Sequence, residues 1–404
     1  MRLSLKFGRI PSIANPTGEK RVDSPDQLRY HLAGHSHIPP AREEPLPAND
    51  IFLQAMTRCL FTAAPEFSHL AWQEFQTAVR QPQLIGWLAP GVCLATAEEP
   101  FAQLGEAWRA QSPIYVRHVC PAAVMTTLNH TSQDVEALRR AVVEHLADQM
   151  VADLSFSVQT RLLDPTTPYK PFDVNERLAQ ALQAECGARL DVRAPQQIVS
   201  VAVGRLADAW VGLAGVSLAA HNLSDWAGGV RRFKREPDQI SRAEFKLLEA
   251  WELFGLTAPP GAQALDLGAA PGGWTRVLRQ RGVWVTAVDP AALDGRLLAD
   301  QGVWHVRVSA ESFLHHLSPS EQFTLILNDM RLDPLPSVHL MAEAAPHLAP
   351  DGWALITLKL PQPRTAGRLV NQALTALSHA YTVAGARQLF HNRQEVTVLL
   401  RQQV

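Results

Sequence analysis

The chain has 404 residues, of which 47% are hydrophobic and 19% charged, and its formal net charge is −2 at pH 7. This is the composition of an ordinary globular protein that is long enough for two or three domains. It contains no apolar run of about 18 residues, which excludes a transmembrane helix. Residues 1–20 lack the apolar core of a secretory signal, and any polyanionic partner must bind a local basic patch because the overall charge is not positive.

Cysteine and histidine spacing gives no sign of a disulfide framework or a metal site. The four cysteines are far apart and form no CxxC pair; they are Cys59, Cys93, Cys120 and Cys186. We interpret them as buried thiols of a cytoplasmic protein. His31 and His35 lie four residues apart, but no helix signal or acidic partner accompanies them, so we expect no metal there.

The first half of the chain divides into an extension and two small modules. Residues 1–50 are rich in proline and polar residues without periodicity, which predicts a loosely ordered N-terminal extension. Residues 51–112 mix short apolar strands with a helix near Ser68–Arg80, which predicts an α/β subdomain.

Residues 113–218 predict a second α/β module. The stretches "HTSQDVEALRRAVVEHLADQMV" and "DVNERLAQALQAECG" are amphipathic helices, the second ending at Gly187, and "LSFSVQTRLL" alternates as a strand. "QQIVSVAVG" and "DAWVGLAG" read as two strands around a turn. Helices over a mixed sheet with no evident catalytic residue suggest a binding domain.

Residues 219–236 form a basic linker. Gly228, Gly229 and Pro237 indicate a flexible connection. Six basic and three acidic residues lie between Arg231 and Lys246. Two interpretations stay open, a solvated linker or a phosphate-binding strip. The candidate RNA-binding residues of such a strip are Arg231, Arg232, Lys234 and Arg235.

Residues 237–404 alternate strands and helices, which predicts a parallel, doubly wound α/β sheet. The expected strands are Ala264–Leu267, Trp284–Val288, Trp304–Val308, Thr324–Leu327, Trp353–Leu358, Thr382–Leu389 and Glu395–Arg401. The expected helices are Ser241–Phe254, Gly273–Arg281, Leu335–Leu348 and Thr365–His379. Because only "FHNRQ" joins the last two strands, we expect them to form an antiparallel hairpin at the sheet edge.

The stretch "LDLGAAPGGW", Leu265–Trp274, follows the first of these strands and opens the first helix. Small residues at such a junction let a ligand approach the main chain near the helix N–H groups. The absence of GK[ST] excludes a P-loop. The loop suits S-adenosylmethionine (SAM), whose amino-acid moiety needs backbone donors and acceptors. The expected contacts are Gly268, Ala269, Pro271, Gly272, Gly273 and Trp274.

Asp289 ends the second strand about 20 residues further on, where a carboxylate can accept both ribose hydroxyls of a nucleoside. Taken alone it could equally be an acid of a surface turn. Its position relative to the loop favours the ribose interpretation.

Four charged residues lie where the strands of the sheet begin or end. Lys246 precedes the first strand, Asp329 ends the fourth, Lys359 ends the fifth, and Glu395 begins the last. Carboxyl ends of parallel strands meet at one edge, and the antiparallel last strand reaches it with its first residue, so all four can face one site. Each could singly be a structural ion pair, since a lysine at a buried strand end requires a partner; together they indicate a catalytic group.

These motifs resemble the FtsJ-like (RrmJ-type) ribose 2′-O-methyltransferases over residues 237–404. The resemblance implies a seven-stranded Rossmann-like SAM-dependent domain with Lys246, Asp329, Lys359 and Glu395 as its catalytic tetrad, and Asp329 also beside the cofactor. Where the family often has an aspartate at the adenine amino group, "VRVSAESF" offers Glu311 or only backbone. Residues 113–218, with "YKPFDVNERL", resemble a THUMP domain, an RNA-binding module. The combination is similar to bacterial enzymes that methylate a cytidine ribose in large-subunit ribosomal RNA.

For that reaction, SAM carries the leaving group and the protein must activate a ribose 2′-hydroxyl. Lys359 is the candidate general base; the positive charge of Lys246 and partial burial would favour its neutral form, whereas Asp329 and Glu395 would orient the lysines. An RNA base methyltransferase and a catalytically silent RNA-binding or assembly protein are the alternatives. The first would normally carry an N/D-P-P-Y motif or a catalytic cysteine, and no cysteine lies beyond Cys186.

Overall fold

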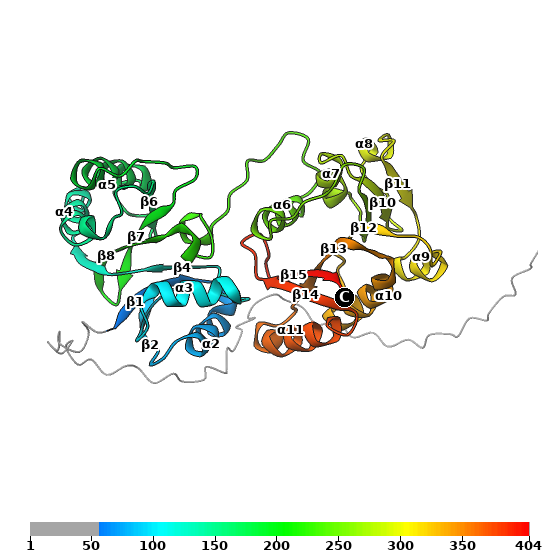
Figure 1. Ribbon diagram of the computed structural model, residues 1–404, viewed down its shortest axis with the longest axis horizontal. Coiled ribbons are helices and arrows are strands. Elements are labelled where there is room, and N and C mark those ends of the chain that lie inside the picture. The colour runs from blue at the N-terminus through cyan, green and yellow to red at the C-terminus, as the bar shows by residue number, and fades with distance from the viewer. Residues whose placement is uncertain (1–55, 404) are drawn as a thin grey trace, which may run out of the picture. The chain divides into compact units, whose positions relative to one another are not determined.

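The structure is a computed structural model, and it describes residues 56–403. The expected extension 1–50, with His31 and His35, lies outside the described residues. Three sheets follow one another along the chain, each with helices packed on it (Figure 1). In this part of the chain no helix has both the length and the apolar character needed to cross a membrane.

The first sheet has the strand order β2-β3-β1-β4 with antiparallel neighbours throughout. Its elements are β1 (Thr57–Thr62), η1 (Pro65–Phe67), α2 (Ser68–Ala78), β2 (Gln83–Ala89), β3 (Val92–Ala97), α3 (Phe101–Ala110) and β4 (His118–Pro121). β4 pairs with β1 although it lies beyond the expected boundary at residue 112. No sequence pattern indicates this pairing, because β4 is short and fully buried.

The second sheet has the order β5-β8-β7-β6, with two antiparallel pairings and one parallel pairing. Its elements are β5 (Val124–Leu128), α4 (Asp134–Leu146), η2 (Ala147–Gln149), β6 (Phe156–Leu162), α5 (Pro171–Cys186), β7 (Gln197–Leu206) and β8 (Ala209–Leu218). α5 ends where Gly187 adopts the left-handed φ of +72°, as its sequence predicts. The helices and strands expected here are confirmed; the domain boundaries stay predictions.

The third sheet has seven strands in the order β11-β10-β9-β12-β13-β15-β14. The strands are β9 (Gln263–Leu267), β10 (Trp284–Val288), β11 (Val303–Val306), β12 (Phe323–Asn328), β13 (Leu348–Lys359), β14 (Tyr381–Arg387) and β15 (Glu395–Gln402). The first five are parallel. The antiparallel hairpin of β14 and β15 is confirmed, and β15 lies inside the sheet, between β13 and the edge strand β14.

The helices of this domain differ from expectation mainly in two short additions. They are α6 (Glu244–Leu253), α7 (Gly273–Arg279), α8 (Gly295–Leu298), α9 (Ala310–His316), α10 (Pro334–Ala344), η5 (Ala345–His347) and α11 (Pro363–Leu377). α8 and α9 were not predicted, because four and seven residues are too few to show helical periodicity. Their caps were visible in the sequence: Asp294 accepts from the Arg296 N–H, and Ser309 from that of Ser312.

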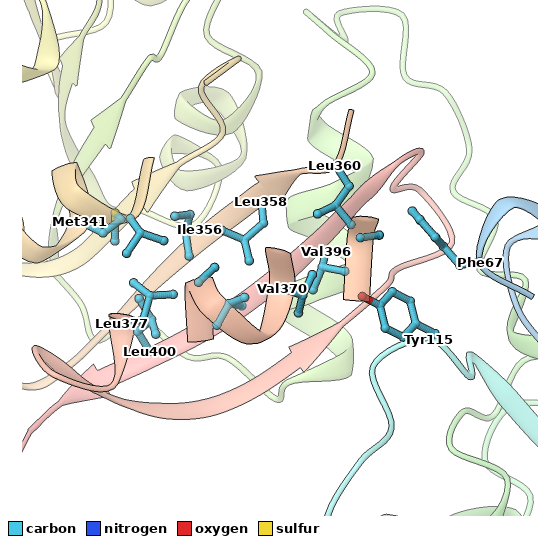
Figure 2. Close-up of a cluster of buried hydrophobic side chains, with 14 of the residues drawn as sticks. Phe67, Tyr115, Met341, Ile356, Leu358, Leu360, Val370, Leu377, Val396 and Leu400 are labelled. Carbon is cyan, nitrogen blue, oxygen red and sulfur yellow. The ribbon is translucent and has the colours of Figure 1, made fainter. Parts of the chain in front are cut away.

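Two buried apolar clusters pack against the seven-stranded sheet. One continues into the first sheet's subdomain, and Figure 2 shows Phe67 and Tyr115 of that subdomain near Leu360 and Val396. Cys59, Cys93 and Cys120 are buried free thiols, as expected, whereas Cys186 is only partly buried because it lies at the end of α5.

Candidate active site

The four charged residues of the expected tetrad form a closed ring of contacts. Lys246 Nζ donates to Asp329 Oδ1 at 2.9 Å and Oδ2 at 3.0 Å, and lies 2.9 Å from Glu395 Oε2. Lys359 Nζ donates to Asp329 Oδ1 and, at 3.0 Å, to Glu395 Oε1. Each lysine therefore contacts both acids, and positive and negative charges alternate around the ring.

Sheet register explains why residues so distant in sequence meet here. Lys359 is the last residue of β13 and pairs directly with Glu395, the first residue of β15. Asp329 follows the last residue of β12, Asn328, which is fully buried. The Asn328 side chain accepts from the Met330 N–H at 3.0 Å and donates to Ser337 Oγ, and so shapes the turn that presents Asp329. Lys246 reaches the ring from α6.

The ring is shielded from solvent without being sealed, because its side chains are 15–18% exposed. Burial lowers the pKa of Lys246, but the carboxylates of Asp329 and Glu395 outweigh it, so this pKa lies above its ordinary value. Lys246 is thus held in its charged form. Two lysines and two acids give the ring no net formal charge.

The glycine-rich loop runs from β9 to α7, next to this edge of the sheet. Gly268 and Gly272 have φ of +73° and +111°, which side chains of L-residues rarely adopt. A Cβ on Gly268 would lie 2.3 Å from the Met330 side chain, and one on Gly272 would lie 2.1 Å from that of Leu297. The reason that the sequence suggested for these glycines, room for a ligand, is therefore incomplete: the protein's own packing and backbone conformation already require them.

Asp289 connects the loop to β10. Its Oδ2 accepts from the Ala270 N–H at 3.1 Å and its Oδ1 from the Ala291 N–H at 2.8 Å. Each carboxylate oxygen keeps a second lone pair, so the ribose hydroxyls of a nucleoside can still be accepted. With the first N–H groups of α7, which have no acceptor within the helix, these residues fit the polar groups of SAM.

Asp266, which sequence reasoning missed, lies in β9 directly before the loop and is 2% exposed. Burial raises its pKa to about 7, against the effect of the Thr275 hydroxyl, which donates to Asp266 Oδ2 at 2.6 Å. The sequence does contain a signal for this residue, because Asp266 stands between Leu265 and Leu267 in a buried strand. A carboxylate buried without a partner is costly, so an acid at such a position must be paired or have a shifted pKa.

Two expected cofactor residues are placed differently from the others. The Trp274 side chain is 4% exposed and its Nε1 donates to the Ala243 carbonyl at 2.8 Å. Its indole therefore belongs to the core, and only its backbone is available to a ligand. Glu311 is exposed in the first turn of α9 and forms no hydrogen bond or ion pair with residues 56–403.

Some charged residues of the linker form ion pairs with other residues of the protein. Arg231 makes a two-pronged contact with Glu252, at 2.6 and 2.8 Å, and its guanidinium lies 4.2 Å from the Phe233 ring centre. Arg276 binds the three acids that lie between Arg231 and Lys246, namely Glu236, Asp238 and Glu244. These ion pairs join the end of the linker to α7, and the flexibility of the rest of the connection stays a prediction. The exposed cations of the strip without an acidic partner among the described residues are Arg232, Lys234 and Arg235.

No group of three or more His, Cys, Asp or Glu side chains in residues 56–403 is arranged to hold a metal ion.

Comparison with known proteins assigns the class. The FtsJ-like methyltransferase family matches residues 239–391, which contain strands β9 to β14 of the third sheet and helices α6 to α11. We call the third sheet with its helices the methyltransferase domain. This class depends on SAM as methyl donor. The match includes Lys246, Asp329 and Lys359 and stops just before Glu395.

Among curated relatives, ribosomal RNA large subunit methyltransferase M of Halorhodospira halophila is 37% identical over 184 residues, which are 44% of this chain and 51% of that protein. The protein of the same name from Alkalilimnicola ehrlichii is 37% identical over 185 residues, 43% of this chain and 49% of that protein. The chain thus spans about half the length of the curated relatives it matches. The crystal structure of TrmN from Thermus thermophilus covers 86% of this chain and 100% of its own, at 17% identity and a TM-score of 0.37, a likeness too weak to carry an argument.

Proposed function

We propose that the protein transfers a methyl group from SAM to a ribose 2′-hydroxyl of RNA. The observation that carries this proposal is the ring of Lys246, Asp329, Lys359 and Glu395 at the carboxyl edge of the sheet, beside the Gly268–Gly272 loop. A hydroxyl nucleophile needs a group that takes its proton. The Nζ of Lys359, which the carboxylates of Asp329 and Glu395 orient, can take this proton when the amine is neutral.

In this proposal Lys359 is the general base. Asp329 and Glu395 orient its Nζ, and Lys246 stays charged and holds both acids in place. SAM supplies a methyl group on a sulfonium, which makes it a good leaving group. The backbone of Gly268, Ala269, Pro271, Gly272 and Gly273 and the carboxylate of Asp289 would hold it. Glu311 or nearby backbone remains our proposal for the adenine contact.

RNA binding is assigned to two surfaces. Arg232, Lys234 and Arg235 offer unpaired positive charge in a protein whose net charge is −2, and cations of this kind bind phosphates. The second sheet with α4 and α5 is the proposed THUMP-like module. The names of the relatives, which specify large-subunit ribosomal RNA, support ribosomal RNA as the substrate and, through the family resemblance, a cytidine as the target.

The experiment is a map of ribose methylation across total RNA from cells with and without this protein. One ribose in large-subunit RNA should lose its methyl group when the protein is absent. A synthetic RNA with that site should then accept methyl in vitro, whereas the same RNA with a single 2′-deoxyribose at the target should bind and accept none, because the 2′-hydroxyl is the nucleophile. Transfer to the deoxy RNA would show base methylation, and unchanged maps with no transfer would favour an assembly role.

A further inference from the structure

A second group of buried charges connects the first sheet's subdomain to the active site. We call it the junction network, and it consists of Glu74, Arg117, Glu249 and Arg387. Glu249 and Arg387 are 3% and 4% exposed, and Glu74 and Arg117 are partly buried. Nothing in the proposed chemistry uses these residues, although burial of four charges is costly unless each is paired.

The first half of the network fixes the segment 113–117, which precedes β4. The Glu74 carboxylate, from α2, accepts the backbone N–H groups of residues 114–116 at 2.6, 2.8 and 3.0 Å. Arg387, at the end of β14, donates to the carbonyl oxygens of Pro113 at 2.6 Å and Arg117 at 3.1 Å. The segment is therefore held from the subdomain on one side and from the methyltransferase domain on the other.

Arg117 connects this segment to the loop 388–394, which leads into Glu395. Its Nε donates to the Gln388 carbonyl at 3.2 Å and its Nη2 to the Leu389 carbonyl at 2.9 Å. The Gln388 N–H donates in turn to the Ile114 carbonyl at 2.7 Å. Apolar packing supports the same contact, since Tyr115 is 5% exposed in the cluster that contains Leu360 and Val396 (Figure 2).

Glu249 connects that loop to the helix carrying Lys246. It lies one turn further along α6, and its two oxygens accept the N–H groups of Phe390 at 2.7 Å and His391 at 2.9 Å. At the far end of the loop, the Gln394 carbonyl accepts from the Leu360 N–H, next to Lys359. Lys246, Lys359 and Glu395 are thus all connected to one loop by short hydrogen-bonded paths.

The two arginines of the network stay charged, whereas burial works against the charged form of its two acids. Burial lowers the pKa of Arg117 and of Arg387 to about 10, which leaves both guanidinium groups protonated at neutral pH. Burial raises the pKa of Glu249 and of Glu74, against the effect of their backbone donors and of Arg387. The hydrogen bonds and the arginine charges therefore offset the burial of these acids only in part.

We propose that Glu249 and Arg117 are positioning residues for methyl transfer, and that segment 113–117 is therefore part of the catalytic unit and not only a connection to an RNA-binding module. This inference rests on the proposed function of the ring. Glu249 sets the distance between α6 and the loop, and so between Lys246 and Glu395, while Arg117 holds the loop on its other side. The positions of Lys246 and Glu395 matter because a misplacement of about 1 Å in a reacting group can lower a rate about 10²-fold.

The first test compares Glu249→Gln with Glu99→Gln. A glutamine keeps the shape but offers one acceptor and one donor where two N–H groups need acceptors. Glu99 is a matched control: the substitution is the same, its side chain is 15% exposed, its carboxylate accepts the backbone N–H and the Nε of Arg80, and it lies outside the ring and the proposed RNA-binding surfaces. We expect Glu249→Gln to lower kcat at least about tenfold while the KM for RNA and the Kd for SAM change by about twofold or less. A kcat equal to that of Glu99→Gln would overturn the proposal.

The second test does not depend on activity. Amide hydrogen exchange of the full-length protein should be faster at 388–394 and at 244–253 in Arg117→Ala, with an intermediate effect in Arg117→Lys, since an ammonium cannot reach both carbonyls with the planar geometry of a guanidinium. Unchanged exchange in Arg117→Ala would refute positioning even if no methyl transfer is ever detected. Conversely, altered exchange in a protein that proves inactive would refute the methyltransferase proposal and leave the coupling established.

Discussion

Replacement of Lys359 by alanine tests the proposed chemistry most directly. Lys359→Ala removes the amine that contacts Asp329 and Glu395, but each acid keeps its contact with Lys246. Loss of one partner of a buried ion pair costs about 3–5 kcal/mol; we expect less here, because the acids stay paired and the ring is 15–18% exposed. The variant should therefore fold and bind SAM and RNA.

The expected loss of methyl transfer is about 10²-fold or more, the usual contribution of a general base, which corresponds to about 2.7 kcal/mol in the barrier. Lys359→Arg should not restore it, because a guanidinium stays protonated and cannot accept the proton.

The assay is single-turnover transfer of radiolabelled methyl to RNA, with thermal unfolding and SAM calorimetry of each variant alongside. Arg109→Ala, which removes an exposed cation of α3 outside the ring and the proposed RNA-binding surfaces, is the control. A Lys359→Arg variant with the wild-type rate, or a Lys359→Ala variant no slower than the control, would refute the reasoning.

Three further outcomes are expected. Asp289→Ala removes the acceptor of two loop N–H groups and should weaken SAM binding at least about tenfold by calorimetry; equal affinity would contradict the cofactor placement. Charge reversal at Arg232, Lys234 or Arg235 should weaken RNA binding and reduce the salt dependence of log K by about 0.7–0.9 for each phosphate that is no longer neutralised, measured by fluorescence titration; an unaltered salt slope would speak against the strip. Burial raises the pKa of Asp266 from 3.8 to about 7, so the folded state binds the proton more tightly than the unfolded chain and stability falls as the pH rises between these two values. Asp266→Asn should therefore show a smaller drop in Tm from pH 5 to pH 8 than the wild type. Parallel curves of Tm against pH for both proteins would exclude a contribution of Asp266.

The strands of the methyltransferase domain could be predicted because each is an apolar run between turn residues, and the alternation with helices then determines a parallel sheet. The meeting of Asp329, Lys359 and Glu395 followed from that topology, since they lie at strand ends on one edge, and Lys246 joins them from α6. Which amine contacts which carboxylate could not be inferred, because this depends on side-chain conformations set by the turn at Asn328.

Other features depend on tertiary contacts that a linear pattern does not contain. Arg231 looked like a phosphate ligand, but α6 places Glu252 beside it. Trp274 follows the glycine-rich loop in the first turn of α7, yet its indole donates to the Ala243 carbonyl next to α6. The junction network was not predicted, because its members are far apart in the sequence and each one alone resembles an ordinary surface charge.

The position of β15 between β13 and β14 has a consequence for biosynthesis. A nascent chain that has reached residue 394 has made β9 to β14, but β13 and β14 have no strand between them, and the ring lacks Glu395. Because β15 provides both the missing strand and the fourth charge, the sheet and the active site are completed in the same step. A chain interrupted by a premature stop before this strand would leave two unpaired strand edges, which favour aggregation, and would lack the fourth member of the proposed catalytic ring.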